Sequence, residues 1–324
     1  MWPFSKKRYS ILESGLLQGM TDCHCHILPG VDDGIQTMDE ALRALQKMSE
    51  LGVREIWLTP HIMEDIPNSP EDLRRRFAEL NDNDNDNDND NENEKGNAVK
   101  VKVKVNANAN ENENEKGNAV KVKVKVNVNA NENENEKGNA VKVNVHVPVD
   151  VPVHLAAEHM LDNLFIQRFA ANDLLPYQSS PLSPLTSPAS PISPLTSNPS
   201  PLLLVETSYF HPPMGLYDIL ENIRKKGYTP LLAHPERYMY MDDADYRRLQ
   251  DMGVKLQLNI LSLAGAYGET AARKSHHLLH QGAYSCMGSD LHNLDSFLEY
   301  VNVKCLTKKE IYLLQSIKGT QLFS

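Results

Sequence analysis

Chemistry-bearing side chains recur at six places along this 324-residue chain, each where a short apolar run ends. The six places are Asp22-Cys23-His24-Cys25-His26, Thr59-Pro60-His61, Glu158, Glu206, His234-Pro235-Glu236-Arg237 and Asp290-Leu291-His292. Imidazole and carboxylate groups without thiolates suit Mn, Fe or Zn, and composition alone does not choose among these metals. A single histidine at a strand end is usually structural, but six such ends together predict a metal centre.

The spacing of these residues adds detail to that prediction. His24 and His26 are two positions apart on an expected strand, so both side chains face the same way and can bind one ion. Asp290 and His292 repeat the spacing. The chain offers more ligands than one ion needs, and Glu158 or Glu206 could bridge two ions. Multinuclear centres of this kind activate water and hold substrate oxygens, which is the chemistry of phosphate-ester hydrolysis.

The cysteines point to no site of their own. Cys23 and Cys25 alternate with the histidines, so we expect them to face away and to be buried as small apolar residues. The alternative, a thiolate zinc site, needs further cysteine partners, whereas Cys286 is expected on a strand and Cys305 is remote. Four cysteines form no disulfide framework and favour a reducing compartment.

An alternation of strands and helices must position the polar groups. Strands are expected at residues 21–25, 55–59, 151–157, 202–205, 229–233, 255–260 and 284–289. Helices are expected at 37–51, from 69 to about 80, at 159–170, 216–226, 243–252 and 270–281, and beyond 293. About seven strand–helix units predict a parallel sheet, closed as a barrel or open. In barrels of this kind functional groups gather at the carboxyl ends of the strands.

Two low-complexity inserts interrupt what is otherwise a single domain over residues 1–324. Residues 81–150 hold Asn/Asp/Glu and Val/Lys repeats, in which copies of NEKGNAVK begin at Asn93, Asn114 and Asn135. We expect this insert to be mostly disordered, although Val-Lys hairpins are an alternative. Residues 179–201 are rich in Ser and Pro and predict an extended loop. Both lie in helix-to-strand connections, away from the active face of a barrel, and should spare catalysis.

Composition excludes several classes of function. The net charge is −10, so a general nucleic-acid surface is not expected. The chain has no apolar run of about 18 residues, which predicts no direct membrane insertion. Lys6, Lys7 and Arg8 are followed by no apolar run of a signal peptide, so a cytoplasmic location is expected.

The motifs resemble those of the PHP (polymerase and histidinol phosphatase) superfamily, and within it the bacterial tyrosine phosphatases of capsule and exopolysaccharide clusters, the CpsB/YwqE-like group. The resemblance rests on DCHCHILPGVDDG at Asp22–Gly34, TPH at Thr59–His61, AAEHMLD at Ala156–Asp162, LLVETSY at Leu203–Tyr209, AHPERY at Ala233–Tyr238 and GSDLHN at Gly288–Asn293. It covers nearly all of the chain outside the inserts. It implies a distorted (βα)7 TIM-like barrel of the PHP type, with a three-metal centre usually supplied with Mn.

The resemblance also implies roles for residues. The implied metal ligands are His24, His26, Asp33, His61, Glu158, Glu206, His234, Asp290 and His292. Asp33 comes from the resemblance alone, since composition does not separate it from Asp32. Arg237 resembles the family's phosphate-binding arginine, and a guanidinium suits two phosphate oxygens. A second arginine, expected soon after GSDLHN, is missing from the stretch Leu294–Phe297, and Arg273 is one candidate replacement.

These features predict a metal-dependent protein-tyrosine phosphatase that attacks phosphorus with a metal-bound hydroxide. No Cys-x5-Arg loop is present, so no phosphocysteine is expected. His292 or His61 could protonate the leaving phenolate, beside their roles as ligands. The resemblance implies a tyrosine-phosphorylated kinase of capsule or exopolysaccharide synthesis as the substrate. One alternative is a small-molecule phosphoesterase such as histidinol phosphatase, and another is a non-catalytic binding protein that works through the repeats.

Overall fold

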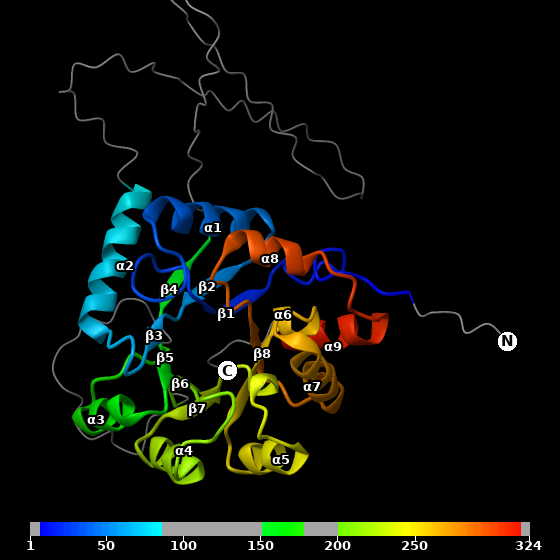
Figure 1. Cartoon of the computed structure of the whole chain (residues 1–324). Coiled ribbons are helices and arrows are strands. Elements are labelled where there is room, and N and C mark those ends of the chain that lie inside the picture. The colour runs from blue at the N-terminus through cyan, green and yellow to red at the C-terminus, as the bar shows by residue number, and fades with distance from the viewer. Residues whose placement is uncertain (1–6, 86–150, 178–199, 319–324) are drawn as a thin grey trace, which may run out of the picture. The chain divides into compact units, whose positions relative to one another are not determined.

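Parallel strands form the centre of the molecule, and helices surround them (Figure 1). The structure, a computed structural model, describes residues 7–85, 151–177 and 200–318, all within one compact unit made of Met1–Asn87 and Val147–Ser324. The strands are β1 (Thr21–Cys25), β2 (Glu55–Leu58), β3 (His61–Ile62), β4 (Val153–Leu155), β5 (Glu158–Met160), β6 (Leu202–Glu206), β7 (Thr229–Leu232), β8 (Lys255–Asn259) and β9 (Cys286–Gly288).

Helices follow most of the strands along the chain. They are α1 (Met38–Glu50), α2 (Pro70–Asn85), α3 (Asn163–Ala171), α4 (Leu216–Lys225), the 3-10 helix η2 (Pro235–Arg237), α5 (Asp243–Asp251), α6 (Ile260–Leu263), α7 (Gly268–Gln281), α8 (Leu294–Val301) and α9 (Lys308–Lys318). Local signals in the sequence explain several boundaries. At the start of α1, Thr37 and Glu40 form a capping box, in which the Thr37 side chain accepts from the Glu40 amide and the Glu40 side chain accepts from the Thr37 amide.

The strands form two hydrogen-bonded sheets, ordered β1-β2-β4 and β3-β5-β6-β7-β8-β9, and all strand pairs are parallel. The chain passes from β2 to β3, and from β4 to β5, within two residues. Beyond β9, the Asp290 amide donates to the His24 carbonyl at 2.7 Å, and the His26 amide donates to the Leu291 carbonyl at 2.9 Å. The sheet therefore curls until its last strand lies beside its first. This is a mixed α/β fold with a curled parallel sheet.

The core has two parts. The larger packs the outer faces of the strands against the helices, and it includes Cys25. The smaller joins residues from strands around the curl, such as Cys23, Trp57 and Leu204, and it includes Cys286. Cys23 and Cys25 are thus buried, as predicted. Burial raises the pKa of the Cys23 thiol far above its usual value, so it stays protonated and is a poor zinc ligand.

Two predicted boundaries were wrong. The helix expected from His159 begins at Asn163, because His159 belongs to β5 and its ring contacts the Leu204 carbonyl and the Leu175 amide. Asp162 caps the helix by accepting from the Phe165 amide at 2.8 Å. The helix expected to end near residue 80 continues to Asn85.

The two predicted inserts, residues 81–150 and 179–201, lie mostly outside the described residues. Among the described residues, no helix is long and apolar enough to cross a membrane.

Candidate metal centre

Two imidazoles from β1 and the loop after it face each other at the centre of the site. The Nε2 atoms of His24 and His26 are 3.0 Å apart. The Nδ1 atom of His24 lies 2.9 Å from Gln257 Oε1, and that of His26 lies 2.8 Å from Asp32 Oδ2. Oxygen partners at Nδ1 favour a proton there and leave each Nε2 a lone pair. Two lone pairs at this distance repel unless a cation lies between or beside them.

A close approach of β9 makes this arrangement possible. A Cβ atom at Gly288 would lie only 2.5 Å from the His24 Cβ and 2.8 Å from its amide nitrogen. Only glycine therefore lets β9 pack against His24 at this point. Behind it, Asp22 accepts from the amide and hydroxyl of Ser289, which joins β1 to the end of β9.

Glu158 is the central carboxylate of the site. Its Oε2 atom lies 3.2 Å from His24 Nε2 and 3.4 Å from His26 Nε2. The same oxygen lies 3.2 Å from His61 Nδ1, and Oε1 lies 3.0 Å from His234 Nε2. Glu158 thus contacts four imidazoles from three parts of the chain, which suits a bridging ligand.

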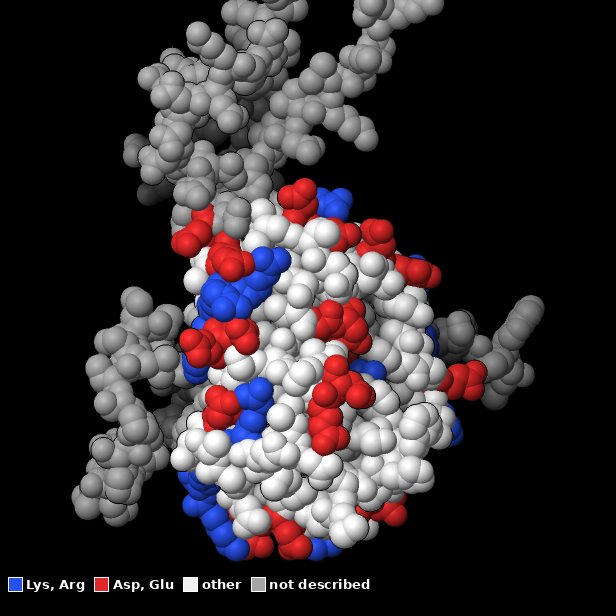
Figure 2. All heavy atoms as spheres, turned by 60° about the vertical axis from the view of Figure 1, so that its left-hand side comes forward, with Lys and Arg blue, Asp and Glu red and all other residues white. Residues whose placement is uncertain are grey.

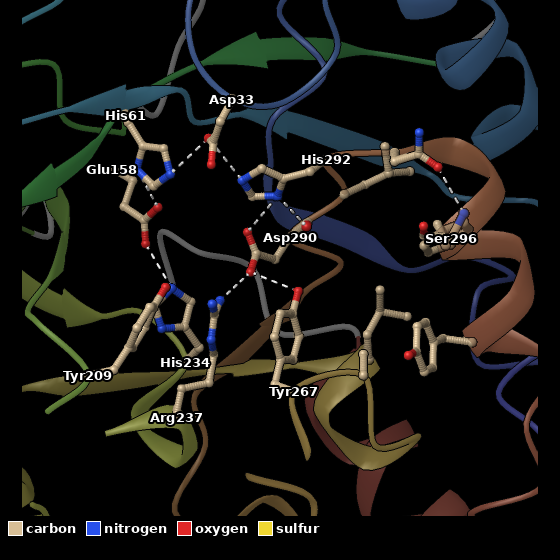
Figure 3. A pocket seen from close by; sticks show the side chains of 16 residues that line it. Asp33, His61, Glu158, Tyr209, His234, Arg237, Tyr267, Asp290, His292 and Ser296 are labelled. Atoms are coloured by element: carbon tan, nitrogen blue, oxygen red, sulfur yellow. Dashed lines mark hydrogen bonds and ion pairs between the residues drawn. The ribbon is translucent and has the colours of Figure 1, made fainter. Parts of the chain in front are cut away.

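Glu206 and Asp33 extend the cluster in two directions. Glu206 Oε1 lies 3.1 Å from His61 Nδ1. Asp33 Oδ1 lies 3.5 Å from His61 Nε2 and 3.4 Å from His292 Nε2 (Figure 3). The Asp33 side chain is 65% exposed, so the cluster reaches the surface on this side.

Asp290 completes the cluster from the end of β9. Its Oδ1 atom lies 3.5 Å from His24 Nε2 and 3.3 Å from His26 Nε2. Three overlapping groups have ligand atoms close enough to hold an ion: His26, Asp33, His61 and His292; His24, His26 and Glu158; and His61, Glu158 and Glu206. The structure brings together all nine side chains that the resemblance implies as ligands.

Unsatisfied polar atoms show that the site fits bound cations. Four buried atoms here make no hydrogen bond: His61 Nδ1, Glu158 Oε2, Glu206 Oε1 and His234 Nδ1. His61 Nδ1 lies 3.2 Å from Glu158 Oε2 and 3.1 Å from Glu206 Oε1, close enough for one ion to bind all three atoms. Buried polar atoms are normally paired, and leaving several unpaired in one place is costly. Each of the four is a good ligand for a divalent metal, so the donor set matches imidazole–carboxylate coordination.

The electrostatics favour the ligand forms of the carboxylates and of His234, but not of every imidazole. Burial alone would raise the pKa of Glu158 and of Asp290, but the nearby charge of His24 holds both well below their usual range. Burial, together with the charge of Arg237, lowers the pKa of His234. Ionised carboxylates and neutral imidazole are the forms that bind metal. Burial would lower the pKa of His24, but Glu158 and Asp290 raise it to about 9, and neighbouring carboxylates also raise the pKa of His26 and His61, so metal binding would release protons from these rings.

The cluster forms one end of a pocket of about 430 Å³ (Figure 3). Its lining comprises Asp33, His61, Glu158, Tyr209, His234, Arg237, Leu261, Ala266, Tyr267, Asp290, Leu291, His292, Asn293, Ser296, Phe297 and Tyr300. Arg237, the last residue of η2, is the only lysine or arginine in this lining, and its Nη1 atom donates to Asp290 Oδ2 at 2.7 Å. A phosphate group in this pocket would therefore have a single guanidinium to bind.

The missing second arginine has no replacement in the described pocket. Arg273 does not line it and instead contacts the Thr270 hydroxyl on α7. Where an arginine was expected, α8 presents Ser296, Phe297 and Tyr300. On the face drawn in Figure 2, acidic side chains stand near the middle and many basic ones toward the left edge. Among the residues that line this pocket, Arg237 is therefore the one lysine or arginine.

Sequence reasoning missed the groups that support the ligands. Asp32 holds His26 and also accepts from the His61 amide at 3.0 Å. Gln257 holds His24, and Tyr209 and Tyr267 flank Arg237. One signal was available, since Gln257 and Asn259 are uncharged polar residues that alternate with leucines on β8, and both are fully buried.

Comparison with known proteins identifies the family. The family model of capsular polysaccharide synthesis proteins, CpsB/CapC, matches residues 20–142 and 191–305. The chain belongs to the CpsB/CapC family. The resemblance noted in the sequence is thereby confirmed.

Two curated members of the family are related to the chain. It is 21% identical over 308 residues to the tyrosine-protein phosphatase YwqE of Bacillus subtilis (strain 168), covering 94% of this chain and 87% of that protein. It is 31% identical over 105 residues to the tyrosine-protein phosphatase CpsB of Streptococcus pneumoniae, covering 30% of this chain and 43% of that protein.

A solved structure shares the fold. It comes from the crystallographic work on YwqE and CpsB, described as unique metal-dependent tyrosine phosphatases. The match has a TM-score of 0.57 at 20% identity and covers 94% of this chain and 89% of that one. The match agrees with the curled parallel sheet seen here.

Proposed function

We propose that this chain is a metal-dependent protein-tyrosine phosphatase, a phosphoric monoester hydrolase. The observation that carries the proposal is the pocket itself, which is lined by His61, Glu158 and His234 of the metal-ligand cluster and by one partly buried guanidinium. Both curated relatives named above are tyrosine-protein phosphatases, and they support this substrate.

The nine residues of the cluster are the proposed ligands. Seven of them form the three overlapping groups, which support a centre of three ions, and His234 and Asp290 contact members of those groups. Mn is the proposed metal, with Fe and Zn as alternatives that the same donors accept. When bound, divalent ions would supply an activated water and neutralise charge on the phosphate oxygens.

The chain's own residues supply recognition and a proton. Arg237 is the proposed phosphate-binding residue, because a guanidinium donates to two phosphate oxygens at once. His292 or His61 is the proposed donor to the phenolate oxygen, beside its role as a ligand. Of the two, His292 is better placed to meet a substrate, because its side chain is 29% exposed and that of His61 is 9% exposed.

The proposed substrate is phosphotyrosine on a protein, namely a bacterial tyrosine kinase of polysaccharide synthesis, in the cytoplasm. The family's link to capsular polysaccharide synthesis supports this partner. We also propose that the fold is a distorted (βα)7 barrel. That count is supported if β2 with β3, and β4 with β5, are each taken as one interrupted strand, since each pair continues within two residues.

The test is release of phosphate from a tyrosine-phosphorylated peptide, with and without Mn. We expect metal-dependent release that is lost in His24→Ala and kept in His277→Ala, since His277 lies on α7 and contacts Asp243 outside the pocket. Release from histidinol phosphate but not from the peptide would favour the small-molecule phosphoesterase. A protein that binds metal but hydrolyses no monoester would contradict the proposal and leave the repeat-based binding protein.

A further inference from the structure

Two tyrosine rings enclose the only guanidinium of the described pocket. The guanidinium carbon of Arg237 lies 4.4 Å from the centre of the Tyr209 ring and 4.0 Å from the centre of the Tyr267 ring. Figure 3 shows Arg237 standing between these two side chains. Tyr209 follows β6, and Tyr267 comes from the loop between α6 and α7, so distant parts of the chain meet on this one residue.

A carboxylate fixes one end of the same guanidinium. Asp290 Oδ2 accepts from Arg237 Nη1 at 2.7 Å and from the Tyr267 hydroxyl at 3.1 Å. It also accepts from Asn259 Nδ2 at 2.8 Å. With Oδ2 occupied by three donors, Oδ1 is the oxygen that faces His24 and His26.

We propose that Tyr209 and Tyr267 are positioning residues that hold the Arg237 guanidinium ready for a phosphate group, and that Tyr267 also joins this guanidinium to the metal cluster through Asp290. The inference rests on the proposed phosphatase function and adds to it the groups that organise phosphate recognition. Neither tyrosine belongs to the set of residues that the sequence predicted.

The physical reason lies in the cost of ordering an arginine. An arginine side chain loses rotamer entropy when it is fixed, and that cost falls on ligand binding if the free protein leaves the side chain mobile. Aromatic faces attract a guanidinium and leave its edge open for hydrogen bonds. Among the described residues, Asp290 alone accepts a hydrogen bond from this guanidinium, so further N–H groups remain for phosphate.

The hydroxyls of the two tyrosines have different surroundings. Burial raises the pKa of both, so both stay neutral at physiological pH. The Tyr267 hydroxyl is bonded to Asp290, whereas the Tyr209 hydroxyl has no hydrogen bond among the described residues. Tyr209 therefore acts through its ring alone, while Tyr267 acts through ring and hydroxyl.

The first test is the binding of inorganic phosphate to the Mn-loaded full chain, measured by calorimetry. We expect Tyr209→Leu and Tyr267→Leu to weaken binding about three- to thirtyfold, because each loses a ring from Arg237. Tyr209→Phe should stay within about twofold, since its ring is kept. Tyr217→Leu is the matched control, because Tyr217 holds Arg248 at 3.5 Å from its ring centre but lies on α4, outside the pocket.

A double-mutant cycle separates positioning from general loss of structure. In an Arg237→Ala background, the further change Tyr267→Leu or Tyr209→Leu should not weaken phosphate binding again. Additive losses in that background would overturn the proposal. So would unchanged phosphate affinity in both leucine variants, or no phosphate binding by the unaltered protein.

Turnover of p-nitrophenyl phosphate gives a second measure. In the leucine variants, KM should rise by the factor found for phosphate binding while kcat falls less. A fall in kcat with KM unchanged would contradict the proposed role. Phosphate binding needs no turnover, so a chain that binds phosphate through the clamped Arg237 but hydrolyses no monoester would overturn the proposed function alone.

Discussion

At the scale of single residues, Asp32 orients the imidazole ring of His26. The carboxylate accepts from His26 Nδ1 at 2.8 Å and from the His61 amide at 3.0 Å, so it fixes two proposed ligands. We expect Asp32→Asn to lower Mn affinity and activity about 10–100-fold, because an amide holds the imidazole less firmly and makes it less basic. Metal titration of the purified protein measures the first effect.

The exposed Asp39→Asn on α1 is the control for this change, since it removes a carboxylate without touching the site. Equal Mn affinity in Asp32→Asn and the unaltered protein would show that Asp32 does not support the ligands. The same result would leave Asp33 as the only residue of this acidic pair with a proposed role in metal binding.

Residue types and their positions at expected strand ends predicted eight of the nine clustered side chains as candidate site residues. The ninth, Asp33, was predicted by resemblance alone. The groups behind them were not predictable in the same way. Asp32 and Asp33 look alike in sequence, and only the fold shows that one turns inward to His26 while the other is exposed. Tyr209 and Tyr267 meet on Arg237 from segments far apart in the chain, a contact that no local pattern encodes.

At the scale of elements, one carboxylate ties α7 to α9. Glu310 Oε1 accepts from His276 at 2.9 Å and from His280 at 3.1 Å, two residues one helical turn apart on α7. Its other oxygen accepts from the amide and hydroxyl of Thr307, at the start of α9. Burial would raise the pKa of Glu310, but these hydrogen bonds and the charge of His276 lower it to about 2.

A lowered pKa makes the contribution of Glu310 depend on pH. The unfolded carboxyl has a pKa of 4.5, so its stabilising effect is complete above that pH and is lost as pH falls toward about 2. We expect Glu310→Gln to reduce the free energy of unfolding at pH 7 by about 1–2 kcal/mol. Urea unfolding at pH 7 and at pH 3 should show the difference between variant and unaltered protein shrinking at the lower pH. A difference independent of pH would contradict the ionic role.

The order of the elements was predicted well, but seven strands were expected and nine are present among the described residues, because two expected strands are broken. Residues 151–157 were expected as one strand, yet β4 ends at Leu155 and pairs with β2, whereas β5 begins at Glu158 and pairs with β3 and β6. An apolar pattern shows that a segment is extended, but not which neighbour it pairs with. The break matters for function, because it places Glu158 opposite His61 in the register.

At the scale of the whole molecule, the proposed metals should stabilise the fold. The proposed ligands come from β1, β3, β5 and β6 and from the segments after β1, β7 and β9, so bound ions would join both sheets across the point where the curl closes. Ligands that bind only the folded state add about 4 kcal/mol at a thousandfold excess over Kd. We therefore expect a chelator to lower Tm by about 8–16 °C for a chain of this size. In His24→Ala, the chelator should lower Tm by less, because one proposed ligand is already missing. A Tm that is unchanged after full metal removal would contradict the proposed stabilisation by metal.

Deletion of the repeats tests whether the first compact unit alone suffices for the proposed catalysis. All nine proposed ligands and Arg237 lie outside the second compact unit, Asp88–His146. We expect replacement of the second compact unit, Asp88–His146, by a linker of about 15 residues to leave kcat/KM for a phosphotyrosyl peptide within about twofold. Shortening a connection about fourfold changes its closure free energy by only about 1 kcal/mol, in favour of the folded state. Thermal unfolding and peptide kinetics measure both effects, and a deletion variant that folds, binds Mn and yet loses activity would assign the repeats a working role.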